Sequence, residues 1–136
     1  MRKALGGIGV ALLMGLVGTV SASAQAPKAA GHLVVVKMVE VAGQQFRFEP
    51  ASITVQPGDT VRWLQESVAP HNVQFESKPK GARLGGADMG GYLTSKGEAY
   101  QLVIDGRFPL GTYGYLCTPH GPMGMKGTMT VAASAP

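Results

Sequence analysis

The chain has 136 residues, of which 45% are hydrophobic and 15% are charged, and its formal net charge is +4. This composition excludes a disordered chain, because the apolar surface is sufficient to offset the entropy lost on folding. The 20 glycines and 9 prolines argue against a helical bundle or a coiled coil. A single cysteine excludes an intramolecular disulfide and a zinc site of the CxxC type.

The first 24 residues have the features of a cleaved secretory signal peptide. Two basic residues precede an uncharged stretch over 4–20, and small residues lead to a cleavage site after Ala24. An uncleaved membrane anchor is the alternative, but five glycines in the stretch make it a poor one. We therefore predict export to the periplasm, a flexible leader over 25–31 and one domain over 32–136.

Cleavage changes the charge of the mature protein. It leaves ten basic and eight acidic residues, a net charge of +2, and no clustered basic stripe. We therefore expect no nucleic-acid partner and no insertion of the mature chain into a membrane. In an oxidising compartment a free thiol is a liability unless it is buried, paired or bound to a metal, so the role of the lone cysteine becomes the central question.

The mature chain predicts short strands joined by turns. The first is the valine-rich segment 33–41, and a short alternating segment at 46–48 ends at Glu49-Pro50. Residues 77–97 are rich in glycine and have room for one helical turn at most. The remaining strands are expected at 52–55, 60–64, 72–76, 98–104, 111–116 and 126–131. The pattern predicts an all-β fold, an antiparallel Greek-key β-sandwich of about eight strands.

One segment near the C-terminus concentrates side chains that bind metals. Cys117, His120, Met123 and Met125 lie within nine residues. Thiolate and thioether are soft ligands that suit copper(I), and imidazole suits copper in both oxidation states. Two imidazoles and one thiolate, with a weak axial methionine, define the blue-copper electron-transfer site. The segment therefore predicts a mononuclear copper centre.

Such a centre needs a second histidine from another part of the chain. His71 lies at a loop-to-strand junction, whereas His32 lies next to the leader, so His71 is the better candidate. A Cys–His catalytic dyad is the chemical alternative, but it gives the methionines no role. A zinc site is less suitable, because structural zinc sites contain more cysteine or histidine.

Several motifs in the mature chain resemble the plastocyanin/pseudoazurin branch of the cupredoxins, and the resemblance covers about residues 46–131. The motifs are Phe48-Glu49-Pro50, Pro57-Gly58-Asp59, Pro70-His71-Asn72-Val73, Gly111-Thr112-Tyr113-Gly114-Tyr115 and Cys117-Thr118-Pro119-His120. The resemblance implies a carrier of single electrons, not an enzyme, with one copper ion cycling between Cu+ and Cu2+. By position it implies that the copper ligands are His71, Cys117, His120 and Met125.

The resemblance also bears on the choice of methionine and on the residues around the ligands. Met125 is favoured over Met123, because Gly127 then follows the ligand by two residues, as it does in the family. Asn72 is expected to hold the His71 loop to the Cys117 loop. Leu116 stands where plastocyanins carry a tyrosine, which puts the tyrosine-mediated exit route in doubt.

We expect redox proteins to dock transiently near His120, and nothing in the sequence requires more than a monomer. Lys78, Lys80 and Arg83 suggest an acidic partner, although a solvated loop accounts for them equally simply. The alternative function is a periplasmic copper-binding protein for copper tolerance or copper handling. The residues available for that role are Met89, Met123, Met129 and His32.

Overall fold

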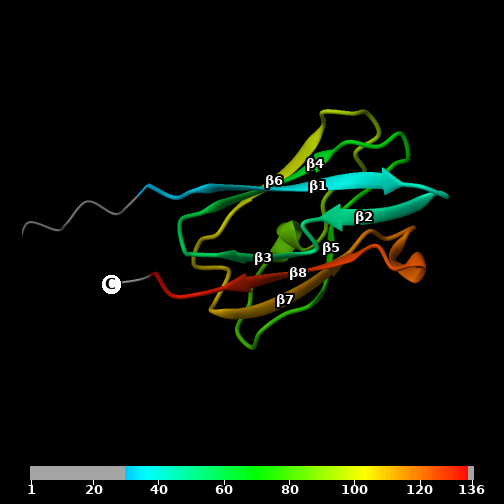
Figure 1. Ribbon diagram of the computed structural model, residues 1–136. Helices are drawn as coiled ribbons and strands as arrows, with labels where there is room; N and C mark the ends of the chain where they lie inside the picture. The colour runs from blue at the N-terminus through cyan, green and yellow to red at the C-terminus, as the bar shows by residue number, and fades with distance from the viewer. Residues whose placement is uncertain (1–29, 135–136) are drawn as a thin grey trace, which may run out of the picture.

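The computed structural model describes residues 30–134, so the predicted signal peptide and residues 25–29 of the predicted leader lie outside it. Eight strands form two four-stranded sheets, with the orders β2-β1-β4-β6 and β3-β8-β7-β5 (Figure 1). The strands are β1 (Leu33–Val41), β2 (Gln45–Glu49), β3 (Ser52–Val55), β4 (Thr60–Gln65), β5 (Gln74–Ser77), β6 (Ala99–Val103), β7 (Gly111–Leu116) and β8 (Lys126–Val131). Two short 3-10 helices are also present, η1 (Gly85–Asp88) and η2 (Gly121–Met123). The predicted eight-stranded sandwich is confirmed.

The pairing of the strands is more mixed than the sequence predicts. β1 pairs with β4 in parallel, and β3 pairs with β8 in parallel, while the other four pairings in the described residues are antiparallel. Parallel neighbours need a long connection. The chain provides one by passing through β2 and then β3, in the other sheet, before β4 returns beside β1.

The core follows from the two-residue period of the strands, which sends alternate side chains inward. Along β4 the inward residues are Val61, Trp63 and Gln65, and none of them has exposed surface. Trp63 packs edge-on against Phe75 and Tyr115, with ring centroids 6.1 and 5.5 Å away. Such aromatic pairs contribute beyond the area they bury.

The two tyrosines before Cys117 belong to this core. Tyr113 and Tyr115 have no exposed surface, and the Tyr113 hydroxyl donates to the carbonyl of Pro109 at 2.8 Å. Gly127 on β8 permits the packing of Tyr115, because a Cβ atom at this position would lie 2.5 Å from the tyrosine ring. β7 is therefore firmly fixed where it leads into Cys117.

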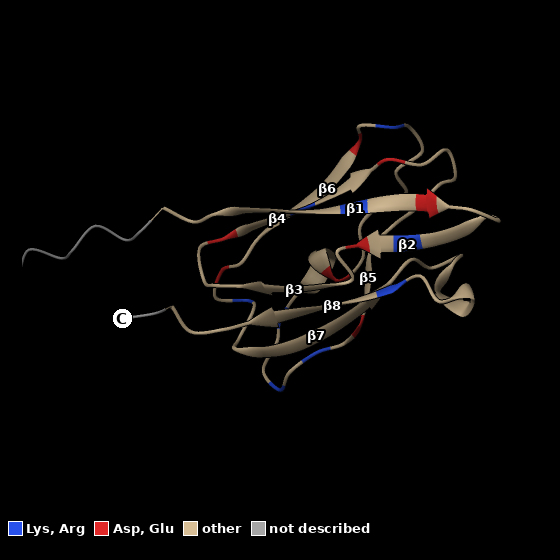
Figure 2. Cartoon of the chain, in the orientation of Figure 1, with Lys and Arg blue, Asp and Glu red and all other residues tan. Residues whose placement is uncertain are grey.

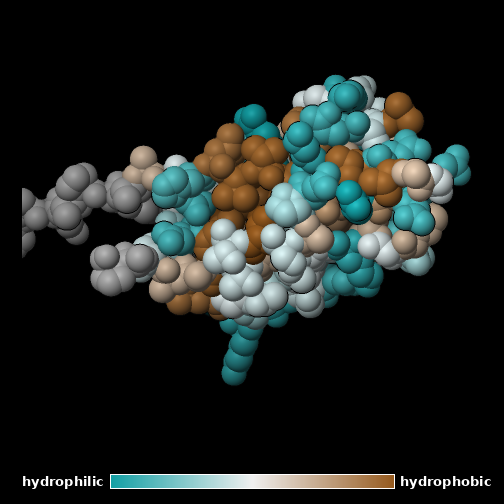
Figure 3. Space-filling model, in the orientation of Figure 1, coloured by the Kyte–Doolittle hydropathy of each residue, from teal (hydrophilic) through white to brown (hydrophobic). Residues whose placement is uncertain are grey.

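The outer face of the first sheet carries an apolar area. Leu33 and Val35 on β1 are 54% and 37% exposed, and Figure 3 shows an apolar area over this part of the strand. This half of β1 lies at the end of the sandwich opposite η2 (Figure 1). Over residues 30–134, none of the helical segments has the length and apolar character needed to cross a membrane.

The opposite end is formed by the loop that joins β7 to β8. β7 ends at Leu116, which pairs with Lys126 at the start of β8. The loop between them, residues 117–125, contains η2 and the predicted metal ligands. A third segment reaches this end at His71, which forms an isolated β-bridge with Leu93. The topology thus brings residues about 50 positions apart to one end of the sandwich.

Candidate metal centre

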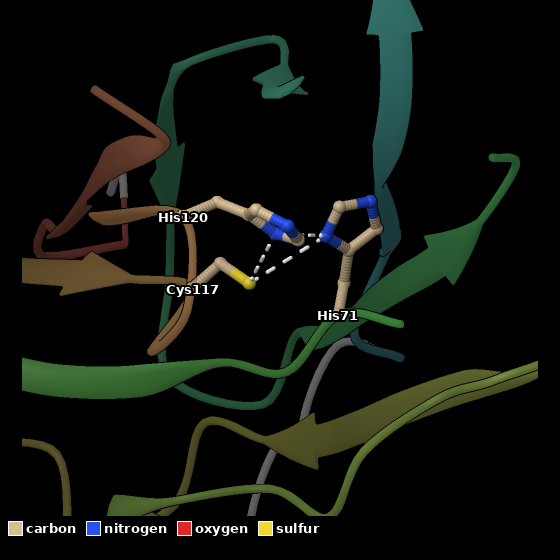
Figure 4. A group of neighbouring side chains, drawn as sticks. All are labelled: His71, Cys117 and His120. Atoms are coloured by element: carbon tan, nitrogen blue, oxygen red, sulfur yellow. Dashed lines mark hydrogen bonds between the residues drawn. The ribbon is translucent and has the colours of Figure 1, made fainter. Parts of the chain in front are cut away.

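Three of the four predicted ligands meet at the end of the sandwich that η2 forms (Figure 4). The Sγ atom of Cys117 lies 3.5 Å from Nδ1 of His71 and 3.3 Å from Nδ1 of His120. The two Nδ1 atoms lie 3.0 Å from each other. Cys117 and His71 have no exposed surface, whereas His120 is partly exposed. The three donor atoms point toward one common space.

Met125 and Met123 occupy different environments. The side chain of Met125 is fully buried, whereas that of Met123 is 65% exposed on η2. The Met125 backbone N–H donates to the carbonyl of His120, and the Met125 carbonyl accepts from the N–H of Cys117, both at 3.1 Å. The Met123 N–H donates to the same carbonyl at 3.0 Å, so burial is what distinguishes the two: only the Met125 side chain lies inside the protein.

The loop folds back on itself through the carbonyl group of Cys117. This oxygen accepts from the N–H groups of His120 and Gly121 at 3.2 and 2.6 Å, and the backbone turns into η2. Gly124 ends η2 with a left-handed φ of 92°, which side-chain-bearing residues rarely adopt. Met125 follows Gly124 directly, and β8 begins at the next residue, so the turn is tight.

Asn72 joins the His71 segment to the Cys117 loop, as the resemblance implies. Its side-chain N–H donates to the Thr118 hydroxyl, and its side-chain oxygen accepts from the Thr118 backbone N–H, both at 2.8 Å. Asn72 is 1% exposed. This reciprocal pair connects residues that lie 46 positions apart and fixes the distance between His71 and Cys117.

Burial makes the uncharged forms of all three donors the stable ones when the protein is free of metal. Burial, with a smaller contribution from nearby His120, lowers the pKa of His71 to about 4. Burial also lowers the pKa of His120. Burial raises the pKa of the Cys117 thiol, although backbone N–H groups of Asn72 and His120 oppose this shift. A bound cation reverses the thiol preference, because a coordinating thiol loses its proton.

Sequence reasoning missed a residue that packs over both histidines. The ring of Phe46, on β2, lies edge-on to His71 at 5.0 Å between ring centroids and tilted over His120 at 4.4 Å. Phe46 thereby restricts the rotation of both imidazoles. The alternating pattern at 46–48 placed Phe46 in a strand but gave no sign that it faces the site.

Sequence reasoning also missed two polar residues behind His71. Nε2 of His71 lies 2.7 Å from the Ser67 hydroxyl, which lies 3.3 Å from the side-chain oxygen of Gln65. The sequence did contain a signal for Gln65: the alternation of β4 places it on the same inward face as Val61 and Trp63. A polar side chain at a core position needs buried partners.

The other candidate residues lie elsewhere. The Nδ1 atom of His32 lies 3.3 Å from a carboxylate oxygen of Asp59. His32 directly precedes β1, and the start of β1 lies at the end of the sandwich opposite η2 (Figure 1). Met129 belongs to the hydrophobic core, and Met89 is 55% exposed. The described residues thus do not gather these side chains at the site, and no observation favours the copper-tolerance role. A Cys–His catalytic dyad is also disfavoured, because a dyad needs one imidazole beside the thiol, and here both His71 and His120 have a ring nitrogen within 3.5 Å of it.

The basic residues after β5 do not border His120. Lys78 pairs with Asp88 at 2.6 Å. The neighbouring Pro79 lies against Gly111, the first residue of β7, whereas Cys117 follows the last residue of the same strand. A six-residue strand separates these ends by about 20 Å. The basic group is therefore distant from the metal donors, and the suggested acidic partner has no support at this face.

An open hollow of about 500 Å³ lies beside His120. Its lining is nearly all apolar and is formed by Pro70, Tyr92, Thr94, Pro119 and His120. The loop 117–125 contains no charged residue, and Figure 2 shows no charge on η2. Of the three donors, His120 alone borders a surface hollow, and that surface is uncharged.

The donor set fits one copper ion. Donors that lie 3.0 to 3.5 Å apart can share one ion whose bonds to nitrogen and sulfur are about 2.0–2.3 Å long. Two imidazoles, one thiolate and an adjoining buried methionine are the ligands of a type 1 copper site. A β-sandwich with this donor set at one end defines a mononuclear copper protein.

Comparisons with known proteins also indicate a copper protein. Residues 34–132 match the model of the family described as "Copper binding proteins, plastocyanin/azurin family". The chain is 43% identical to plastocyanin of Scenedesmus fuscus over 86 residues, 62% of this chain and 85% of that protein. It is 35% identical to plastocyanin of Synechococcus sp. (strain JA-2-3B'a(2-13)) over 125 residues, 88% of each protein.

Solved structures show the same likeness. The oxidized plastocyanin of Dryopteris crassirhizoma is 31% identical with a TM-score of 0.60, covering 73% of this chain and all of that one. The pseudoazurin of Methylobacterium extorquens AM1 is 32% identical with a TM-score of 0.51, covering 74% and 75% of the two chains. The chain therefore belongs to the plastocyanin/azurin family of copper-binding proteins. It is a cupredoxin with a plastocyanin-like type 1 copper site, and it is an electron carrier, not an enzyme.

Proposed function

We propose that His71, Cys117, His120 and Met125 are the four copper ligands and that the protein carries single electrons in the periplasm. The observation that carries this proposal is the convergence of one thiol and two imidazoles within 4.8 Å of one another. Copper, when bound, supplies a one-electron couple between its +1 and +2 states. The protein residues supply a fixed, mostly buried set of donors.

The surroundings of the donors favour electron transfer, because they resist a change of shape. Phe46 packs against both imidazoles, and Asn72 ties the two ligand-bearing segments together. Pro119 and Pro122 restrict the backbone of the loop by fixing φ. Donors that cannot move keep a similar geometry in both oxidation states, and little reorganisation is then needed.

The fourth ligand can be tested by substitution of each methionine. We expect Met125→Leu to change the reduction potential clearly, because the axial ligand tunes the potential of a blue-copper site. Met123→Leu is the matched control, since its side chain is 65% exposed, and the potential should stay nearly unchanged. Cyclic voltammetry of both variants measures the difference. A larger shift in Met123→Leu would contradict the assignment of Met125.

The surface over His120 is the proposed contact for redox partners. The hollow beside the ring is apolar, and Met123 adds an exposed apolar side chain to the same loop. An uncharged apolar surface of modest size favours brief encounters, which typically bury less than about 1,200 Å². We infer that the partners present a similarly uncharged apolar area around their own redox centre.

Electron self-exchange between two copies of the protein tests this surface without a known partner. Met123→Glu places like charges against each other in the encounter, and like-charge contacts cost several kcal/mol. The exchange rate, measured from NMR line widths of mixed oxidation states, should fall at least about tenfold. Leu110→Glu is the control, because Leu110 is 55% exposed next to the far end of β7. Equal rates in both variants would place the contact elsewhere.

The periplasmic location rests on the N-terminal sequence and on the lone thiol, which ligation to copper would protect. N-terminal sequencing of the protein recovered from its native compartment tests the predicted cleavage. The mature chain should begin at Gln25. An intact N-terminus at Met1 would contradict export by a cleaved signal peptide.

A further inference from the structure

Two polar residues form a buried hydrogen-bonded chain behind His71, on the side of its ring away from the other metal donors. Nε2 of His71 lies 2.7 Å from the Ser67 hydroxyl, and Ser67 is 5% exposed. The Ser67 hydroxyl lies 3.3 Å from Oε1 of Gln65, a residue with no exposed surface. Because these groups are buried, their hydrogen bonds must be satisfied by one another and by neighbouring residues.

The orientation of the Gln65 amide is determined by its partners. Its Nε2 donates to the carbonyl oxygens of Ala69 and Leu93 at 2.6 and 3.0 Å. Its Oε1 accepts from the Ser67 backbone N–H at 3.2 Å. The reverse orientation would set the amide oxygen against two carbonyl oxygens, neither of which can donate. Oε1 of Gln65 therefore faces Ser67 as an acceptor.

The Ser67 hydroxyl has two acceptors within reach besides the ring of His71. Its two oxygen neighbours, Oε1 of Gln65 and the carbonyl of Ala69, both lie at 3.3 Å, and neither can donate. The hydroxyl can donate to either of them while its own oxygen accepts the N–H of His71 Nε2, and this arrangement satisfies every group of the chain. With its proton on Nε2, His71 keeps the lone pair of Nδ1 on the side of Cys117, as a metal ligand requires.

We propose that Ser67, held in place by Gln65, is a positioning residue that fixes the tautomer and ring orientation of His71 for metal binding. This inference rests on the proposed function, since it requires His71 to be a ligand. An acceptor on the distant ring N–H makes the ligating nitrogen more basic. A more basic nitrogen favours copper(II) over copper(I), so Ser67 lowers the reduction potential of the site.

The test begins with the metal-free protein at pH 7, where ¹⁵N NMR reports which ring nitrogen of His71 is protonated. Wild type should show a single Nε2-protonated form, and Ser67→Ala should show a mixture of both tautomers. Ser67→Ala should bind copper(II) about tenfold more weakly, the lower end of the range for lost outer-shell partners. With copper(I) affinity unchanged, this corresponds to a potential about 59 mV higher.

Ser77→Ala is the matched control. The Ser77 hydroxyl accepts a hydrogen bond from the Gly114 N–H at 3.0 Å. Ser77 is the last residue of β5, and this hydrogen bond does not involve any of the proposed metal ligands. We expect Ser77→Ala to leave the tautomer of His71 and the potential unchanged. An equal potential shift in both serine variants would show that general loosening of the fold, and not the Ser67 hydroxyl, is responsible.

Two results would overturn the inference. One is a wild-type His71 protonated on Nδ1, which the NMR spectrum reveals even if Ser67→Ala does not fold. The other is a folded Ser67→Ala protein with the wild-type potential. A wild-type copper(II) protein without an intense visible band would instead contradict the proposed ligand set. The spectrum of the metal-free protein would still decide the role of Ser67.

Discussion

Replacement of Cys117 by serine is expected to abolish the intense visible absorption of the copper(II) protein. The band arises from the bond between copper(II) and thiolate sulfur, and Cys117 is the only cysteine of the chain. A serine hydroxyl occupies a similar volume, but it is not a soft ligand. We therefore expect nearly complete loss of the band, measured by absorption spectroscopy of a folded sample with one equivalent of copper(II).

The control for this experiment is Met123→Leu, which alters the same loop at an exposed position. It should retain the band at full intensity. If Cys117→Ser kept the band, another group would have to be the charge donor, and the type 1 assignment would fail. If wild type lacked the band when fully loaded and folded, the site would bind copper in some other way.

Replacement of Asn72 by alanine is expected to cause the largest loss of stability among the changes considered near the site. It removes both hydrogen bonds to Thr118 and leaves the Thr118 backbone N–H without this partner. Each such bond contributes about 1 kcal/mol net, and leaving a group unsatisfied adds to the cost. We expect the free energy of unfolding to fall by about 2 to 3 kcal/mol, measured by urea denaturation of the metal-free protein.

The loss of stability in Asn72→Ala should occur without loss of the copper site. The backbone N–H of Asn72 that opposes the rise in the Cys117 pKa is retained in the alanine variant, so the copper(II) band should persist. Thr112→Ala is the matched control. The Thr112 hydroxyl, on β7, contacts the Thr130 hydroxyl, on β8, at 3.3 Å and at an exposed position. This substitution should change the stability by less than about 0.5 kcal/mol. Equal losses in both variants would remove the special role of Asn72.

Most of the fold was predictable, because the strands of this protein alternate clearly and their turns carry glycine and proline. The parallel pairings of β1 with β4 and of β3 with β8 were not. Alternation reports which residues face inward, but it contains no information about which strand lies beside which. That choice depends on how the two sheets pack together.

The candidate site divides in the same way. A short segment holding Cys117, His120 and Met125 was informative, since a thiol, an imidazole and a thioether at such close spacing are typical of a copper-binding loop. The contribution of Ser67 could not be predicted, because a serine in a loop is ordinary and only its 2.7 Å contact with His71 reveals its role. Phe46 was hidden for the same reason, as its two imidazole contacts join different parts of the chain.

The sequence by itself determined the chemistry of the protein: one thiol, its neighbouring histidine and methionine, and a chain rich in short strands. Ligand type is a local property, and a nine-residue segment is sufficient to express it. Only the tertiary structure decided how His71 is oriented, which methionine is buried and which side chain packs against both imidazoles. These depend on contacts between segments far apart in the chain, and such contacts exist only once the tertiary structure has formed. Asn72 and Thr118, 46 residues apart, meet only because β5 pairs with β7.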